Sequence, residues 1–246
     1  MSMDFCFLCQ KDLGKSMPTL VMRSKPPGYT GAFVCPGKST RTEAYSDKIV
    51  ERATAFVDNV GYKRIGVKSD QEESMKALQS RVQTRSKAEI VLLNSKKYDS
   101  QSNGVAEQAV QDIEGQARTL KLHLENRVMK TLPPGHPVVH WLVEYAAEVI
   151  NRFRRVSGGA PPRDRLRGPH RCRPMAEFGE SVLWAADTWE SGRVEQLEPK
   201  FSPGIWLGVC PRTDEAIIGT PSAIIRARRV KRKPIERAFN AEELLA

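Results

Sequence analysis

Three acidic residues, Asp4, Asp70 and Glu107, stand where a carboxylate could take part in metal chemistry. Asp4 interrupts the apolar run 3–9, Asp70 ends a second run at 65–70, and Glu107 lies near the start of a long helical pattern. A lone carboxylate is costly to bury unless a cation or a hydrogen-bond donor compensates it. Three such groups that converge would repel one another and form a seat for hard divalent cations. The sequence therefore predicts, as a hypothesis, a cation pocket.

Each position has a competing interpretation. Asp12 could replace Asp4, although it stands in the turn-like Lys-Asp-Leu-Gly. Glu72 could replace Asp70, although it fits the start of a helix, and Asp99 lies near Glu107 in a polar segment. Glu107 itself also fits an ordinary acidic residue in the first turn of a helix, where the helix dipole favours it.

The spacing of apolar residues predicts the elements that must position these carboxylates. We expect strands at 3–9, 18–23 and 31–35, a helix at 42–60, a strand at 64–68, a helix at 71–85, a buried strand at 90–93, and helices at 105–129 and 137–154. Polar residues at 94–103 predict a loop before the long helix. This order of elements favours a mixed α/β (α+β) fold of the ribonuclease-H-like class, with a sheet flanked by helices.

The long helix carries two stripes of side chains. The apolar stripe predicts the core-facing residues Val105, Ala109, Ile113, Ala117, Leu120 and Leu124. The polar stripe comprises Glu107, Gln111, Glu114, Arg118, Lys121 and Glu125. Glu107 is about 200° around the helix from Val105, so it leaves the core face and can meet carboxylates at the edge of a sheet.

At these residues the chain resembles the catalytic core of retroviral and LTR-retrotransposon integrases. Residues 102–107, Ser-Asn-Gly-Val-Ala-Glu, read as that family's Asn-Gly-x-x-Glu, and 68–70, Lys-Ser-Asp, fill the place of its second Asp motif. The 36 residues between Asp70 and Glu107 are close to the family's spacing. The resemblance is strongest to Copia-type Pol polyproteins and covers nearly the whole chain. One departure is Gln71-Glu72, where many members have Asn-Gly.

The resemblance implies a fold, an activity and partners. The fold is ribonuclease-H-like, and Asp4 would bridge two Mg²⁺ ions, for which Mn²⁺ could substitute, while Asp70 and Glu107 each hold one. The implied reactions are 3′-end processing and DNA strand transfer between element ends and a target duplex. A homo-oligomer and a nuclear location, or a cytoplasmic one before nuclear entry, are also implied.

Two other functions stay open on the sequence. The His-His-Cys-Cys zinc domain of full integrases and the reverse transcriptase and protease segments are missing from this sequence. We therefore also consider a catalytically silent nucleic-acid-binding remnant, in a fragment, a decayed copy or a truncated gene model. A ribonuclease-H-type nuclease would use the same metals, but the Asn-Gly-x-x-Glu pattern speaks against it.

Composition bounds the class of protein. The chain has 246 residues, 40% of them hydrophobic, with a formal net charge of +10, which allows a real core and favours polyanion partners. No apolar run is long enough for a bilayer, and no signal peptide is apparent. Five cysteines are too few for a disulfide framework. Cys6 and Cys9 would diverge on a strand, so we interpret them as apolar fillers, and His136 with His140 as structural or surface residues.

The expected domains are 1–156 for the catalytic core, 157–177 for a basic Pro/Gly-rich linker, 178–233 for an SH3-like β-barrel and 234–246 for a tail. Basic residues at 226–233 fit either phosphate contacts and a nuclear address or a charged edge strand protected against aggregation. The residues that we expect to contact nucleic acid are Asn103, Gln111, Arg118, Lys121, Arg226, Arg228, Arg229, Lys231, Arg232 and Lys233.

Overall fold

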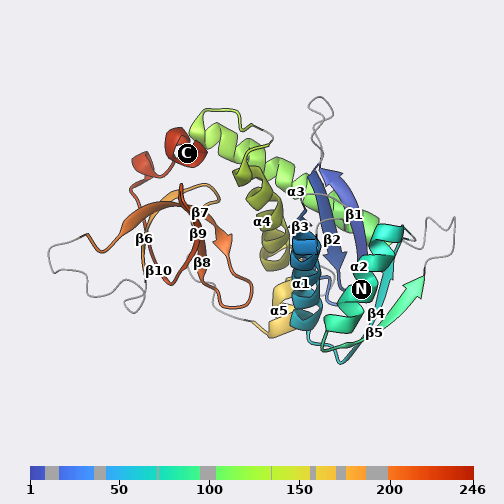
Figure 1. Cartoon of the computed structure of the whole chain (residues 1–246). Helices are drawn as coiled ribbons and strands as arrows, with labels where there is room; N and C mark the ends of the chain where they lie inside the picture. The colour runs from blue at the N-terminus through green and yellow to red at the C-terminus, as the bar shows by residue number, and fades with distance from the viewer. Residues whose placement is uncertain are drawn as a thin grey trace. The chain divides into compact units, whose positions relative to one another are not determined.

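A computed structural model gives the fold of the chain (Figure 1). The residues that it describes are 1–8, 17–35, 43–70, 72–94, 104–133, 135–155, 159–169, 176–186 and 199–246. The chain forms two compact units, Met1–Ala117 with Ala146–His170, and Arg118–Tyr145 with Arg171–Ala246. None of the helices in these described ranges is long and apolar enough to cross a bilayer.

The first unit contains a mixed five-stranded sheet. Its strands are β1 (Ser2–Leu8), β2 (Met17–Arg23), β3 (Thr30–Val34), β4 (Arg64–Ser69) and β5 (Glu89–Asn94). They lie in the order β3-β2-β1-β4-β5, in which β1 to β3 form an antiparallel meander. β4 runs parallel to β1, and β5 parallel to β4. This sheet, with helices on its faces, confirms the predicted fold class.

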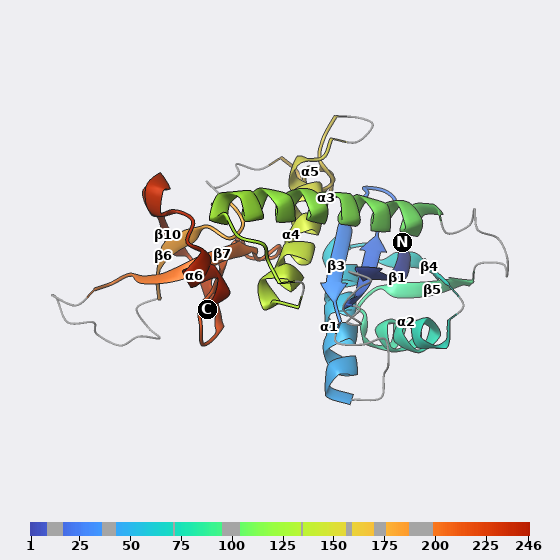
Figure 2. The same ribbon diagram turned by 90° about the horizontal axis from the view of Figure 1, so that it is seen from above.

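Helices cover both faces of this sheet (Figure 2). They are α1 (Glu43–Val60), α2 (Glu73–Arg85), α3 (Gly104–Val128) and α4 (Pro137–Phe153). Alternate strand residues point to opposite faces. Met3 accordingly packs in the apolar core that α1 and α2 form with the sheet, whereas Asp4 and Cys6 point to the opposite face.

Polar contacts fix α3 and α4 on that opposite face. Arg23, at the end of β2, pairs with Asp112 of α3 at 2.7 Å. The side-chain oxygen of Asn151 on α4 accepts the Thr30 backbone N–H at 2.8 Å, and its amide donates to the Thr30 carbonyl at 2.7 Å. The two bonds give the buried Asn151 amide both partners in the sheet, as a buried polar group requires.

Two expectations about apolar residues had different outcomes. Ala109, Ile113 and Leu124 of α3 are buried, which confirms the predicted core stripe. The predicted strand at 90–93 is confirmed as part of β5, and Ile90 is buried, but the prediction that the whole strand is buried was wrong, because Leu92 and Leu93 are 36% and 48% exposed. β5 is one of the two outer strands of the sheet and has a neighbour on one side only.

The second unit contains an antiparallel sheet. Its strands are β6 (Ser181–Ala185), β7 (Ser202–Val209), β8 (Ala216–Gly219), β9 (Ile224–Ala227) and β10 (Arg229–Arg232), in the order β10-β6-β7-β8-β9. Val182, Trp206 and Ile218 are among the buried residues of its core. These strands form a small antiparallel β domain.

Two short helices were not predicted. Pro162–Arg167 form α5 inside the expected linker, where Arg163 is buried and Leu166 packs against the first unit's core. Ala241–Leu245 form α6 inside the expected tail. The Asn240 side chain caps α6 by accepting the Glu242 and Glu243 N–H groups.

Candidate active site

Two of the predicted carboxylates stand on or directly after the neighbouring parallel strands β1 and β4. Ser2 is paired with Lys68 in the parallel ladder, and the Lys68 N–H donates to the Met1 carbonyl at 2.9 Å. Asp4 is two residues after Ser2 on β1, and Asp70, two residues after Lys68, directly follows β4. Residues two apart on a strand share a face. The register therefore assigns both carboxylates to the face that α3 covers.

The third predicted carboxylate stands at the start of α3. Glu107 lies in the first turn of the helix, where the positive end of the helix dipole favours an acidic residue. Glu107 and Asp70 are exposed, and Asp4 is half-buried. Two of the three carboxylates are thus open to a solvent-borne ion or substrate.

A further carboxylate on α3 was not predicted as a site residue. Burial raises the pKa of the Cys6 thiol to about 12, and the negative charges of Glu114 and Asp4 raise it further. Glu114 therefore lies within electrostatic reach of β1, on the same side as Asp4. The sequence signal for it is its spacing of seven residues from Glu107, two turns along one face of the helix. Cys6 is buried, as expected of an apolar filler.

The chemistry of these donors suits a hard cation, because Mg²⁺ prefers carboxylate oxygens. In the described part of the chain, however, no three His, Cys, Asp or Glu side chains converge closely enough to hold a metal ion. His136 and His140, which are both described, belong to no such cluster. The trio supplies suitable oxygen donors on three elements, but the arrangement is not a closed ligand shell.

The competing acidic residues have separate outcomes. Glu72 is the residue before the first turn of α2, as a helix start requires, and it accepts a hydrogen bond from the Ser74 hydroxyl at 3.4 Å. Asp12 and Asp99 lie outside the described residues, as do Cys9 and the predicted nucleic-acid contact Asn103.

The predicted nucleic-acid contacts on α3 differ in their surroundings. Gln111 and Arg118 are exposed. Lys121 pairs with Glu125 at 2.6 Å, and Glu125 also accepts the Leu132 backbone N–H at 2.8 Å. Burial raises the pKa of Glu125, but these two hydrogen bonds outweigh it and lower that pKa below its usual value. The charge of Lys121 is therefore already partly neutralised.

Much of the basic segment 226–233 is paired within the β domain. Arg232 pairs at 2.7 Å with the fully buried carboxylate of Glu180. Arg228 pairs with Glu215 at 2.9 Å, and Lys233 pairs with Glu243 at 3.1 Å. Hydrogen bonding to Glu180 accordingly raises the pKa of Arg232.

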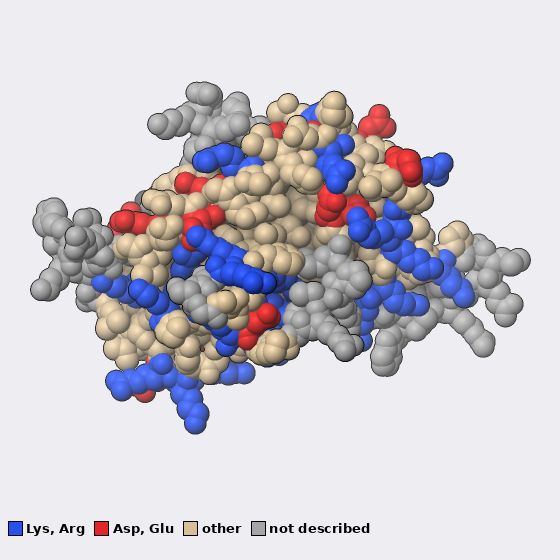
Figure 3. Space-filling model, turned by 180° about the vertical axis from the view of Figure 1, so that it is seen from behind, with Lys and Arg blue, Asp and Glu red and all other residues tan. Residues whose placement is uncertain are grey.

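The other basic residues of the segment stand on the edges of the sheet. Arg226 and Arg229 are exposed, and the Lys231 ammonium lies 4.4 Å from the centre of the Phe201 ring. β9 and β10, which carry them, are the two outer strands. On the face drawn in Figure 3, Lys and Arg side chains gather in several groups, with Asp and Glu beside some of them. Their contact with nucleic acid stays a prediction.

Comparison with known proteins gave matches only among solved structures. No family model and no curated protein matches the chain. A simian T-cell lymphotropic virus intasome in complex with PP2A regulatory subunit B56 gamma matches at 12% identity and a TM-score of 0.48, over 95% of this chain and 77% of that one. The catalytic core domain of BIV integrase matches at 15% identity and 0.46, over 67% and 92%.

A third match is the HTLV-2 integrase catalytic core domain in complex with magnesium, at 12% identity and a TM-score of 0.47, over 65% of this chain and 90% of that one. These structural neighbours are retroviral integrases or their cores. Likeness at this level carries no conclusion about the activity, metal or partners of this chain.

Proposed function

We propose that this chain is an integrase-type polynucleotidyl transferase that carries out metal-dependent 3′-end processing and DNA strand transfer. The observation that supports the proposal is the parallel pairing of Ser2 on β1 with Lys68 on β4, two residues before Asp4 and Asp70 respectively. Glu107 in the first turn of α3 completes the set of donors. In the proposed site, a bound cation would offset the mutual repulsion of these carboxylates.

In this proposal Asp4, Asp70 and Glu107 would hold Mg²⁺. The bound ion would supply Lewis-acid polarisation of a phosphoryl oxygen and activation of a water or hydroxyl nucleophile. The protein itself performs little covalent chemistry in phosphoryl transfer, and positioning matters most. Asp4 is anchored within the sheet, whereas exposed Asp70 and Glu107 leave an approach for a strand end.

The β domain would act as the SH3-like module that follows the core in Copia-type polyproteins. Arg226, Arg229 and Lys231 would contact DNA phosphates, in keeping with the net charge of +10. We further propose a homo-oligomer that acts on element ends and target duplex in the nucleus.

A catalytically silent DNA-binding remnant is the second candidate. One observation favours it. In the described ranges, no three potential ligands lie close enough together to hold a metal ion. The basic surface would then bind DNA without chemistry.

A joining assay separates these candidates. Purified protein is incubated with Mg²⁺ and labelled duplex ends, and joined products are resolved on a gel. We expect Asp70→Asn and Glu107→Gln to abolish joining while salt-sensitive DNA binding is kept, and Glu72→Gln to act as wild type. No joining by the wild type, or equal joining by all four proteins, would reject the proposed activity.

A further inference from the structure

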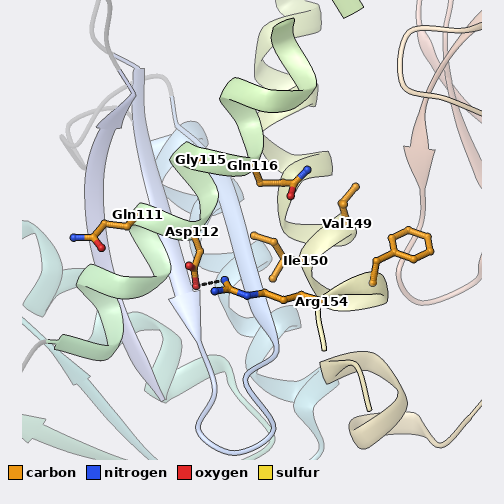
Figure 4. A pocket seen from close by; sticks show the side chains of 8 residues that line it. Gln111, Asp112, Gly115, Gln116, Val149, Ile150 and Arg154 are labelled. Atoms are coloured by element: carbon orange, nitrogen blue, oxygen red, sulfur yellow. Dashed lines mark ion pairs between the residues drawn. The ribbon is translucent and has the colours of Figure 1, made fainter. Parts of the chain in front are cut away.

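Two ion pairs of this chain differ in how firmly their carboxylate is held. In the first unit, Arg154 lines an open groove between α3 and α4 and pairs there with Asp112, which Arg23 also binds at 2.7 Å (Figure 4). In the second unit, Glu243 of the five-residue helix α6 pairs with Lys233 at 3.1 Å. The Asp112 side chain is 8% exposed and that of Glu243 is 41% exposed. The carboxylate on α6 is therefore the one that an anion from solvent could replace.

Ser181 and Lys233 form a small oxyanion site beside α6. The Lys233 ammonium donates to the Ser181 hydroxyl at 2.6 Å, and this hydroxyl in turn donates to Glu243. Ser181 is fully buried, and its backbone N–H donates to the Ala238 carbonyl at 2.7 Å. A hydroxyl and an ammonium that converge on one carboxylate are also the kind of donors that proteins use for phosphate oxygens.

The Glu243 carboxylate occupies this site as an anion. The hydrogen bond from Ser181 lowers its pKa most, burial acts in the opposite direction, and the hydrogen bond and charge of Lys233 lower it further, so that the pKa lies below the ordinary value of 4.5. Glu243 is therefore ionised near neutral pH. Lys233, whose side chain is only 16% exposed, has its charge both covered and neutralised by this contact.

The helix α6 depends on its contacts with the β domain. Leu244 is 5% exposed, and α6 packs against β7. A helix of five residues is not stable in isolation, because nucleation costs more than its few hydrogen bonds return. An anion that took the place of Glu243 would therefore weaken both the attachment of α6 and the helix itself.

The charges along the chain favour a polyanion as that competitor. Residues 226–233 include six basic side chains and no acidic one, whereas 234–246 include three acidic side chains and one basic one. The oxyanion site lies where the basic segment meets the acidic one. A duplex presents a row of phosphates, so it can meet this site and the exposed Arg229 together, which a single carboxylate cannot.

We propose that Ser181 and Lys233 form a phosphate site that α6 keeps closed, with the Glu243 carboxylate in place until a DNA phosphate displaces it. DNA binding by the β domain is then limited by the displacement of α6. The inference rests on the proposed DNA contact of the β domain and adds its regulation. An ion pair with a structural role alone would leave DNA binding unchanged when the charge of Glu243 is removed.

Anisotropy of a labelled blunt duplex, mixed with the full chain in EDTA, tests the site without catalysis. We expect Glu243→Gln to bind about fivefold more tightly than wild type at about 0.1 M salt, with a salt slope steeper by about one, because one more ammonium meets a phosphate. The matched control is Glu242→Gln, which makes the same change of charge one residue earlier on α6. It should stay within about twofold of wild type, since salt screens exposed charges.

Two further variants separate the site from a general effect of charge. In a Lys233→Met background, Glu243→Gln should bring no gain in affinity, because the ammonium that it would expose is absent. Leu244→Ala removes the buried side chain that anchors α6. It should raise affinity as Glu243→Gln does, while hydrogen exchange of residues 241–245 becomes faster. Circular dichroism checks the fold of each variant.

Three results would overturn the inference. They are equal affinity of Glu243→Gln and Glu242→Gln for the duplex, a gain by Glu243→Gln that survives in the Lys233→Met background, and unchanged hydrogen exchange of α6 when the wild type is saturated with duplex. Tighter binding by Glu243→Gln in a protein that cannot join DNA would reject the proposed catalysis and keep the inference. Joining by the wild type, with equal binding by the two glutamine variants, would do the reverse.

Discussion

The two units of this chain differ in the surroundings of the charged residues that were predicted to be functional. In the mixed sheet, Arg64 of β4 pairs with its register partner Glu89 of β5 at 3.2 Å, whereas the predicted carboxylates Asp4 and Asp70 lie two residues beyond the paired Ser2 and Lys68 of β1 and β4. In the second unit, basic residues of the predicted DNA-contacting segment are matched with acidic ones: Arg232 of β10 pairs with Glu180, which precedes β6, and Lys233 pairs with Glu243 of α6. Opposite charges in contact stabilise a fold, whereas like charges side by side do not. We therefore expect the proposed metal-dependent reaction to take place at the mixed sheet.

The same contrast exists within α3. Asp112 is nearly buried and held by two arginines, while Glu107, five residues earlier, is exposed. A carboxylate with two guanidinium partners has its charge compensated within the fold. Asp112 therefore has a structural role, and the ligand role of Glu107 is part of the proposed function.

The largest expected effects come from replacing one proposed metal ligand, Asp4, and one carboxylate paired with arginines, Asp112. The first should lower joining activity and the second should lower stability. Asp4→Asn should lower joining by about 10²–10³-fold, because a metal site supplies several kcal/mol to the transition state, and should leave unfolding in urea nearly unchanged. Asp112→Asn should lower the unfolding free energy by about 3 kcal/mol, because two arginines lose their buried partner. Comparable destabilisation by Asp4→Asn would break the contrast.

Substitution of two arginines of the β domain should likewise have different effects, one on stability and the other on DNA binding. Arg232→Ala leaves the fully buried Glu180 carboxylate without this guanidinium, and we expect a loss of about 2 kcal/mol in unfolding free energy. Arg226→Ala should leave stability within about 0.5 kcal/mol and should lower the salt slope of DNA binding by about one. Thermal unfolding and anisotropy at several salt concentrations measure the two quantities. Equal effects of both variants on both quantities would refute the division.

Acid should unfold the second unit before the first. The pKa values of Glu125, Glu177 and Glu243 are all lowered in the folded second unit, Glu177 chiefly by its hydrogen bond with His123. A depressed folded-state pKa contributes stability above the ordinary value of 4.5, and this is lost as pH falls through the folded-state pKa. In the first unit, burial raises the pKa of Asp112, but hydrogen bonds from Arg154 and Arg23 outweigh it and lower that pKa.

The four tryptophans, which all fall in the second unit, allow this order to be observed. Below about pH 4 their fluorescence should change at a higher pH than the far-ultraviolet circular dichroism of the whole chain. Coincident transitions would show that the two units lose stability together.

The sequence predicted those elements of the fold whose apolar residues recur with the period of a strand or a helix. Alternating and helical apolar spacing located the five strands of the mixed sheet and the four long helices, and therefore the elements that carry Asp4, Asp70 and Glu107. The exposure of β5 was missed because a run of four apolar residues does not distinguish an outer strand from a buried one. α5 and α6, six and five residues long, are too short for helical periodicity to reveal.

Pairings between distant residues were beyond the sequence. Arg232 and Glu180 are 52 residues apart, and nothing in local spacing indicates that one neutralises the other. From the sequence alone, every basic side chain of segment 226–233 could contact DNA. In the structure, Arg228, Arg232 and Lys233 are paired with acidic residues. The approach of Glu114 to β1 likewise depends on how α3 crosses the sheet.

Binding of Mn²⁺, followed by electron paramagnetic resonance, tests the central claim most directly, because it measures the cation seat without requiring catalysis. Wild-type protein, Asp4→Asn, Asp70→Asn, Glu107→Gln and the control Glu72→Gln would be titrated with the ion. We predict saturable binding in wild type and control that is lost or strongly weakened in each of the other three. Equal binding by all five proteins, or none by the wild type, would contradict the assignment of these carboxylates to one site.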